Sequence, residues 1–536
     1  MPPVETDESK RNTQQIPALD PTSLDPNEDA VLPISGRRGR EARGEIGLTP
    51  DGRLKTGRLA GLSLRRAIFT LSWPVLVDSF LNSLVGLTDT MVAAAISTAA
   101  TDAIGNASYT LWFVGLFFMA LDIGATALLS RAVGGGRMAV ANAAVGQTLL
   151  LAAVLGVVLG VFMGLVADPL GSLMGMSGDA AAEFRTYLHV VAFDIPFMSV
   201  LVAGIACLRG SGDTFRPMRA MILVNIVNLA LSWALSGADY RTTTMVDGQS
   251  VTRIVIQNPF PFHLGVMGIG FGTLLGHATG AALIVWTLFR GSAGLKLKRH
   301  RLYKPHWHTM RRIVRVGFPN FLETLGMWAG NFPIILMVGW ISADLVGAHI
   351  LAVRIEAFSF QPGFAIGIAA AALAGQYLGA GSPRLARRAI LICTALSSIV
   401  MAAMGILFIF AGQQIVSVLS PQPLHLEVTP KLLAITGLVQ IPFAIGIVFR
   451  QAMRGAGDVK VVMYITWLCT YGARLPLAYI LSGVDIPLPG GGHFANPFGF
   501  HPSVTMLWVG LCAEIILRAI AFTARFIQGG WATARV

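Results

Sequence analysis

Long runs of apolar residues, separated by short polar loops, fill the chain from about residue 65 to its end. Twelve of these runs reach about 20 residues, the length that an α-helix needs to cross a bilayer. The pattern predicts membrane-spanning helices near residues 67–94, 105–130, 140–166, 183–208, 217–236, 264–290, 312–340, 344–375, 386–411, 429–453, 459–481 and 504–527. The fold class that follows is an all-α polytopic membrane protein.

The apolar pattern repeats itself about 245 residues further along the chain. The segment SWPVLVD, which contains Asp78, corresponds to VGFPNFLE, which contains Glu323. In the same way CLRGSGD, which begins at Cys207, corresponds to AMRGAGD, which begins at Ala452. A duplicated apolar chain of this kind predicts two six-helix bundles with the same orientation, related by a pseudo-twofold axis along the membrane normal.

Basic residues gather in alternate loops. Those that follow the even-numbered spans are rich in arginine and lysine, including the loops that we assign to Arg209 and Arg454, whereas the other loops hold few. This asymmetry follows the positive-inside rule. We therefore expect a multi-pass protein of the plasma (inner) membrane with both termini in the cytoplasm. The formal net charge of +12 then reflects topology, and nucleic acid is not an expected partner.

The composition shifts divide the chain into four parts. The first part has no apolar period and is rich in Pro, Gly and charged residues, which is typical of disorder. The predicted parts are a disordered cytoplasmic tail at 1–64, an N-terminal six-helix bundle at 65–290, a basic cytoplasmic linker at 291–311 and a C-terminal six-helix bundle at 312–536.

The composition also excludes several classes of protein. Residues are 54% hydrophobic and 13% charged, and the mean hydropathy is +0.65, so a water-soluble fold is excluded. No nucleotide-binding G-x-x-x-x-G-K-[ST], H-E-x-x-H or G-x-S-x-G motif is present. The cysteines lie in apolar stretches without disulfide or metal spacing and are interpreted as packing residues. We expect no cofactor and no enzymatic activity.

Acidic side chains inside the spans are the first functional candidates, because a charge at the centre of a span costs roughly 2.5–3.5 kcal/mol. Asp78 and Asp89 are 11 residues apart in the first span, so both lie on one face of the helix. Glu323 is the repeat-mate of Asp78, and Asp194 precedes a proline in the fourth span. These carboxylates either exchange protons or bind Na⁺ in an inner cavity, or they hydrogen-bond backbone groups freed by nearby prolines.

Two further sets of residues have both a functional and a structural interpretation. Asn228 and Ser232 lie one turn apart in the fifth span, where they offer oxygens to a cation or bond to a neighbouring helix. His277 stands alone in its span, and we interpret it as a core histidine. Large apolar side chains could line a promiscuous substrate cavity or simply pack in the core; the candidates are Trp112, Met119, Met327, Trp328 and Phe358.

Together these motifs resemble the multidrug and toxic compound extrusion (MATE) family over nearly all of residues 65–531. The resemblance is carried by GLTDTMVAA around Asp89, by the paired RGSGDTFRPM and RGAGDVKVVM, by GFPNFLE, and by the closing RFIQGGW. It implies a V-shaped pair of bundles that alternates access and exports compounds in exchange for H⁺ or Na⁺. The cation site of the archaeal and DinF-like branch matches this chain at Asp89, Asn228 and Thr273, whereas Ser232 stands where that branch has an aspartate.

The expected function is therefore secondary antiport. Small organic compounds, cationic or amphipathic, would leave the cell in exchange for H⁺ or Na⁺ bound at Asp89, and the protein would act as a monomer in the lipid bilayer. A lipid-linked oligosaccharide flippase of the same wider superfamily is the alternative, and a membrane-embedded enzyme is a distant one. The scarcity of arginine within the predicted spans argues against the flippase.

Overall fold

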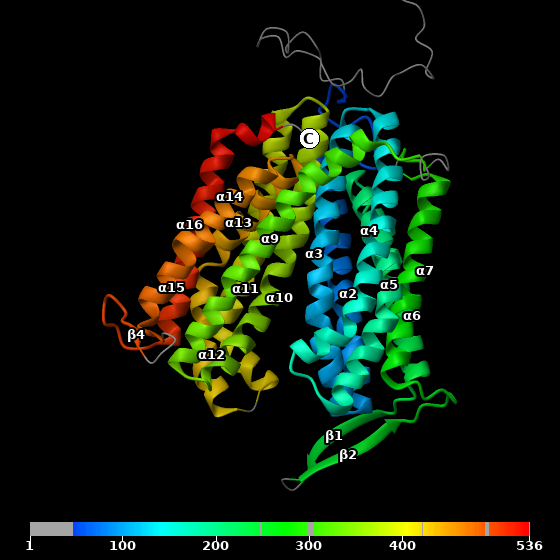
Figure 1. The fold of residues 1–536 in the computed structure, drawn as a ribbon. Coiled ribbons are helices and arrows are strands. Elements are labelled where there is room, and N and C mark those ends of the chain that lie inside the picture. Colours follow the sequence, from blue (N-terminus) through cyan, green and yellow to red (C-terminus); the bar gives the residue numbers. More distant parts are fainter. Residues whose placement is uncertain are drawn as a thin grey trace, which may run out of the picture. The chain divides into compact units, whose positions relative to one another are not determined.

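The computed structural model describes residues 47–246, 249–292, 294–297, 304–420, 422–487 and 492–534. Two sets of long helices lie side by side (Figure 1). The first half consists of α2 (Leu64–Ile96), α3 (Thr98–Gly134), α4 (Met138–Leu173), α5 (Gly178–Gly210), α6 (Phe215–Ser236) and α7 (Gly265–Arg290). The second half begins with α9 (Trp307–Ile341), α10 (Leu345–Gly379), α11 (Pro383–Leu419), α12 (Pro423–Leu438) and α13 (Gln440–Gly455), and it ends with α14 (Val459–Cys469), η2 (Thr470–Arg474), α15 (Leu475–Ser482), α16 (Val504–Gln528) and η3 (Gly530–Thr533).

Two of the predicted spans are interrupted. Helices α12 and α13 form one span that bends by 60° at Val439. The next span runs without a loop from α14 through the π-helical η2 to α15. Pro476 in the first turn of α15 has no N–H to donate, which favours a wide turn before it. With these two spans added to the ten uninterrupted helices of the described residues, the predicted twelve-helix, two-bundle layout is confirmed.

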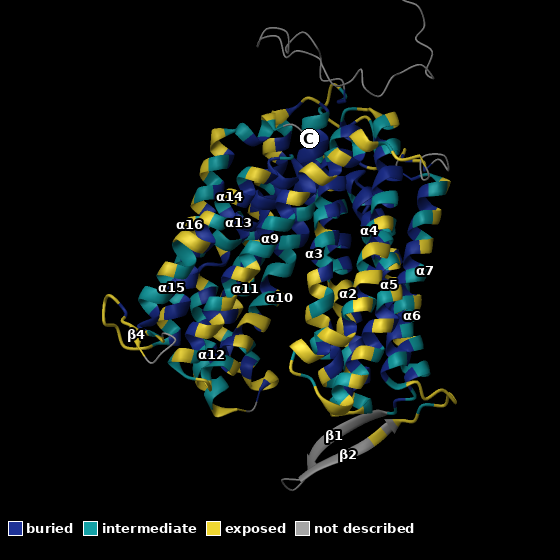
Figure 2. Cartoon of the chain, viewed as in Figure 1, coloured by how far each residue is buried: buried dark blue, intermediate teal, exposed yellow. Residues whose placement is uncertain are grey.

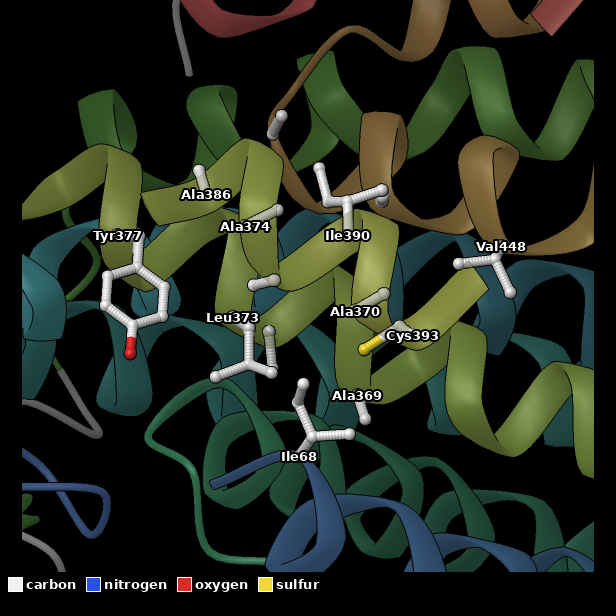
Figure 3. Close-up of a cluster of buried hydrophobic side chains, with 14 of the residues drawn as sticks. Ile68, Ala369, Ala370, Leu373, Ala374, Tyr377, Ala386, Ile390, Cys393 and Val448 are labelled. Atoms are coloured by element: carbon white, nitrogen blue, oxygen red, sulfur yellow. The ribbon is translucent and has the colours of Figure 1, made fainter. Parts of the chain in front are cut away.

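The repeat is visible in how the halves meet. Helix α2 packs against α10, and its repeat-mate α9 packs against α3, the repeat-mate of α10. One of the buried clusters joins the halves: Ile68 of α2 lies beside Ala369 and Leu373 of α10 (Figure 3). Two contacts related in this way are what a pseudo-twofold axis produces.

The closest approach occurs where α3 and α10 end. We call this the basic end of the helices, because the arginine-rich loops predicted to be cytoplasmic connect there. A Cβ built on Gly134 would lie 2.6 Å from the Cα of Gln376, and one built on Gly379 would lie 2.9 Å from the Cα of Arg131. Gly134 and Gly379 occupy the same position in the two repeats, as do Arg131 and Gln376. The same close contact is therefore made twice.

Hydrogen bonds reinforce the contact at the basic end. Arg131 Nη2 donates to the carbonyl of Ala456 at 2.7 Å, and Gln376 Nε2 donates to the carbonyl of Gly210 at 2.9 Å. All residues of 124–130 in α3 and of 369–377 in α10 are buried. Toward the opposite end the same helices are buried on one side only, and large apolar side chains are exposed there (Figure 2).

The segment before α2 corrects one expectation. We expected a disordered tail over 1–64, but the residues from 47 onward pack on the basic end of the helices. Leu48, Leu54 and Leu59 are buried in the cluster that includes α10 and α11, and the N–H of Arg58 donates to the carbonyl of Ser211 at 3.3 Å. Three leucines spaced along a polar stretch give this segment an apolar side that the absence of a helical period concealed. Residues 1–46 lie outside the described part of the chain.

The two long loops at the opposite end contain short strands. The first holds β1 (Tyr240–Val246) and β2 (Gln249–Ile256), which pair antiparallel. The second holds β3 (Ile486–Pro487) and β4 (His493–Phe494).

Candidate functional site: a buried carboxylate in the first half

Asp89 of α2 is buried among neutral polar side chains. Asn228 Nδ2 donates to its Oδ1 at 3.0 Å, and Thr273 Oγ1 donates to its Oδ2 at 2.7 Å. Tyr187 donates its phenol proton to the same Oδ2 at 3.1 Å. Ser232 completes the group, with its Oγ 3.3 Å from Asn228 Nδ2. All five side chains are buried, and no ion pair to Asp89 is present among the described residues.

Four helices of the first half bring this cluster together, namely α2, α5, α6 and α7. The close packing of α6 on α7 depends on glycine. A Cβ on Gly272 would lie 2.5 Å from the backbone N of Ser232, and one on Gly276 would lie 3.1 Å from the carbonyl of Val224. Glycines that face one neighbouring helix allow the backbones to approach closely. This approach brings Thr273 of α7 to within 3.0 Å of Asn228.

The cluster has more acceptor atoms than its protons can satisfy. The Nδ2 group of Asn228 has two protons but lies within hydrogen-bond distance of Asp89, Ser232 and Thr273. Its Oδ1 is buried and has no partner among the described residues. One carboxylate, one free amide oxygen and three hydroxyls therefore converge. This donor set suits a proton or a hard monovalent cation such as Na⁺, because hard cations prefer oxygen ligands.

The predicted cation-coupling residues Asp89, Asn228, Ser232 and Thr273 therefore lie together. Sequence reasoning missed Tyr187. The signal that could have found it is its position seven residues before Asp194 in the fourth span, which places the two side chains on the same face of α5.

Asp78 and Glu323 are not part of this cluster, and both are held by arginines. Asp78 Oδ2 accepts a hydrogen bond from Arg209 Nη2, and Glu323 Oε2 lies 2.8 Å from Arg454 Nη2. Neither carboxylate was expected to have an arginine partner, because we assigned Arg209 and Arg454 to cytoplasmic loops. They lie instead in the last turns of α5 and α13, where they neutralise their buried partners.

Asp194 and His277 form a second buried pair in the first half. His277 Nδ1 lies 2.9 Å from Oδ1 and 2.8 Å from Oδ2 of Asp194. His277 is thus a core histidine with a partner, as we interpreted it, but the partner is one of the candidate acids. This contact joins α5 to α7 beside the Asp89 cluster.

The candidate substrate-cavity residues lie in different places. Trp112 of α3 and Trp328 of α9 pack edge to face across the two halves, with ring centroids 4.2 Å apart. Met119 is exposed on α3 next to Thr324. Met327 instead lies between arginines, with its Sδ 3.7 Å from Arg450 and 3.9 Å from Arg518.

Phe358, the last of these candidates, is exposed on α10. Met327 therefore belongs to the charged interior of the second half rather than to an apolar lining. The other four candidates lie on α3, α9 and α10, the helices through which the halves meet.

Comparison with known proteins identifies the family. The sequence model of the MatE family matches residues 74–234 and 319–480, one match in each half. The chain belongs to the MatE family. It is therefore a MATE family transporter, a multi-pass membrane protein as the helices indicate.

Individual relatives agree along nearly the whole chain. The chain is 25% identical over 470 residues to the probable multidrug resistance protein NorM of Thermotoga maritima, which covers 87% of this chain and 93% of that protein. It is 24% identical over 483 residues to the multidrug resistance protein PmpM of Pseudomonas aeruginosa, with coverages of 87% and 93%.

Solved structures show the same fold. A crystal structure of MATE in the bent conformation superposes with a TM-score of 0.75 at 19% identity, over 88% of this chain and 96% of that chain. A structure described as the outward-facing conformation of a multidrug resistance MATE family transporter also has a TM-score of 0.75 at 19% identity, with coverages of 88% and 97%. The MATE fold therefore extends over both halves.

Proposed function

We propose that this MATE transporter is a secondary antiporter of the inner membrane, which exports small organic compounds of cationic or amphipathic character in exchange for H⁺ or Na⁺. The observation that carries the proposal is the buried carboxylate of Asp89, which is surrounded by neutral donors and touches no described arginine. A buried acid without a fixed counter-charge is costly. It is retained where its charge is exchanged during function. The proposal makes the chain a transporter and not an enzyme.

The mechanism follows from the charge of this cluster. When Asp89 is ionised, the first half has a negative charge that attracts an organic cation. When Asp89 takes up a proton or Na⁺ from outside, this attraction is lost and the substrate leaves. A proton that enters down 100 mV contributes about 2.3 kcal/mol, which supports a substrate gradient of tens-fold.

The arrangement of the halves supports an alternating-access cycle. The basic end is closed by the paired contacts of Gly134 with Gln376 and of Gly379 with Arg131, whereas the opposite ends of α3 and α10 expose apolar side chains. We interpret this as the state that opens to the outside. The counterpart state would part the contacts at the basic end and bring the opposite ends together, as in rigid-body switching between packed halves.

The charge distribution favours organic compounds over a pyrophosphate-linked lipid. A flippase for lipid-linked oligosaccharides would need free cationic side chains around the head group. Several arginines of the described helices are instead in contact with acids: Arg209 with Asp78 and Arg518 with Glu514. Arg450 lies 4.0 Å from Glu323, and Arg454 lies closer to the same acid.

The test uses purified protein in liposomes with the fluorescent cation ethidium as the substrate. A pH gradient and a Na⁺ gradient are imposed separately, and ethidium accumulation is measured for the wild type and for Asp89→Asn. We expect one of the two gradients to drive ethidium accumulation by the wild type. Asp89→Asn should lose at least nine-tenths of that accumulation, a tenfold effect that corresponds to about 1.4 kcal/mol. Asp102→Asn, an exposed acid on α3, is the matched control and should behave as wild type. Gradient-driven accumulation by Asp89→Asn at the wild-type rate would refute the role of this carboxylate.

A further inference from the structure

The buried Asp194–His277 pair has no function in the mechanism above. Both oxygens of Asp194 lie within 2.9 Å of His277 Nδ1, and the two side chains are only 2% and 9% exposed. Histidine is the side chain whose charge changes most readily near neutral pH. A carboxylate in contact with it stabilises the protonated ring. The pair can therefore hold a proton inside the first half without a net charge.

The position of the pair relative to Asp89 is set by the same two helices. Helix α5 supplies Tyr187 to the Asp89 cluster and then Asp194, seven residues or about two turns later. Helix α7 supplies Thr273 and then His277, four residues or about one turn later. Both helices run toward the basic end, where they finish at Gly210 and Arg290. The pair therefore lies about 6–10 Å nearer the basic end than the Asp89 cluster, on the same helix faces.

A third layer of charges lies further in the same direction. Helix α2 begins at the basic end, and Asp78 precedes Asp89 by 11 residues, or about 16 Å. Asp78 is in contact with Arg209, and Arg209 lies 3.8 Å from Asp122 of α3. The first half thus has three polar layers along its axis: the Asp89 cluster, the Asp194–His277 pair and the Asp78–Arg209–Asp122 group.

Few other titratable groups face the middle layer. Helix α4 contributes only Asp168, which is paired with Arg185 at the opposite end. The charged residues of α6, Arg216 and Arg219, stand in its first turns at the basic end. The groups that can exchange charge with the pair are therefore those of the neighbouring layers, namely Asp89, Tyr187, Asp78, Arg209 and Asp122.

We propose that the Asp194–His277 pair is the second proton-carrying site of the transporter, through which a proton released by Asp89 continues to the basic end. This inference rests on the proposed coupling of export to protons. The O–H bond at Asp89 is broken, an N–H bond forms at the imidazole, and Asp194 neutralises the resulting charge. The N–H bond of the imidazole then breaks and the proton passes to Asp122, the partly exposed carboxylate of the third layer, which restores the pair. Asp194 and His277 act as relay residues, since both side chains are buried inside the first half.

The experiment compares two modes of transport in liposomes with ethidium. Gradient-driven accumulation requires proton movement through the protein. Counterflow of labelled against unlabelled ethidium at equal pH requires only that the substrate is bound and carried across. We expect His277→Gln and Asp194→Asn each to lower accumulation driven by a pH gradient at least tenfold, to leave counterflow within about twofold of wild type, and to flatten the pH dependence of export between about pH 6 and 8. His189→Gln, at an exposed histidine on α5, the helix of Asp194, is the matched control and should leave all three unchanged.

Each outcome decides the inference. Wild-type accumulation and pH dependence in both variants would overturn it. A parallel loss of accumulation, counterflow and thermal stability would also overturn it, because the pair would then only hold α5 to α7. Accumulation by the wild type that is driven by Na⁺ and not by protons would overturn this inference and leave the proposed function standing. That result is distinguishable, because it is seen before any residue is changed.

Discussion

Breaking the ion pair between Asp78 and Arg209 should destabilise the protein without abolishing exchange by the molecules that remain folded. The side chains of Asp78 and Arg209 are 4% and 14% exposed, and Asp122 is the only second carboxylate near this arginine among the described residues, at 3.8 Å. Removal of one partner of a buried pair costs about 3–5 kcal/mol, because the other charge is left without compensation.

The two single substitutions should differ in magnitude. In Asp78→Asn the guanidinium keeps Asp122, so we expect a cost near the lower limit, about 3 kcal/mol. In Arg209→Met two carboxylates face each other without a cation, so we expect about 5 kcal/mol. The double variant Asp78→Leu/Arg209→Met replaces the pair by apolar groups. It should recover part of the loss, because a packed apolar pair is often as stable as a buried ion pair, while Asp122 still loses its contact with Arg209.

The assay is unfolding of the purified protein in detergent, followed by ethidium counterflow in liposomes normalised to the folded fraction. The second half offers a matched comparison. Glu323 and Arg454 form the corresponding buried pair, so Glu323→Gln and Arg454→Met should each destabilise the protein, and Glu323→Leu/Arg454→Met should recover part of the loss. If Asp78→Asn unfolded like wild type but lost counterflow, the structural role that we assign to Asp78 would be wrong.

Two further predictions concern the contact between the halves and the Asp89 cluster. Gly134→Val should overpack the contact with the α10 backbone and destabilise the state closed at the basic end by about 1–3 kcal/mol. Spin labels at the opposite ends of α3 and α10 should then show a larger population at short distance. Gly105→Val, with nothing within 4 Å of its Cβ, is the control and should show the wild-type distribution. Tyr187→Phe removes one hydrogen bond to Asp89, worth about 1.5 kcal/mol for a charged acceptor. Gradient-driven ethidium accumulation should fall about tenfold, and the exposed Tyr109→Phe should leave it unchanged.

The helices and the core of the cation site could be predicted because they depend on local patterns and on the repeat. Apolar runs gave the spans to within several residues, and the one-turn spacing of Asn228 and Ser232 placed both on one face. The free-energy cost of a charge inside a span singled out Asp89, and the resemblance to the MATE family added Thr273. The structure then brought all four together through the packing of α2, α6 and α7.

Contacts between distant segments could not be predicted in the same way. Arg209 and Arg454 were assigned to loops because a basic residue in the last turn of a helix cannot be told from a basic residue in the following loop by sequence alone. Each meets an acid 131 residues earlier in the chain. The periodicity of apolar residues within one helix carries no information about a contact with a residue 131 positions away in the sequence. The same limit explains why Asp194 and His277, 83 residues apart, were considered separately.

The comparison of the two halves separates residues that maintain the fold from residues that do chemistry. The pairs Asp78–Arg209 and Glu323–Arg454 recur with the same separation in both repeats. A feature that both halves need is a feature of the bundle itself. Asp89 has no such counterpart, because the position 11 residues after Glu323 is Ile334, which is buried in an apolar cluster. If the buried acid served packing, the second half would also need one. Its restriction to the first half supports the proposal that the charge at Asp89 is kept for exchange with an ion.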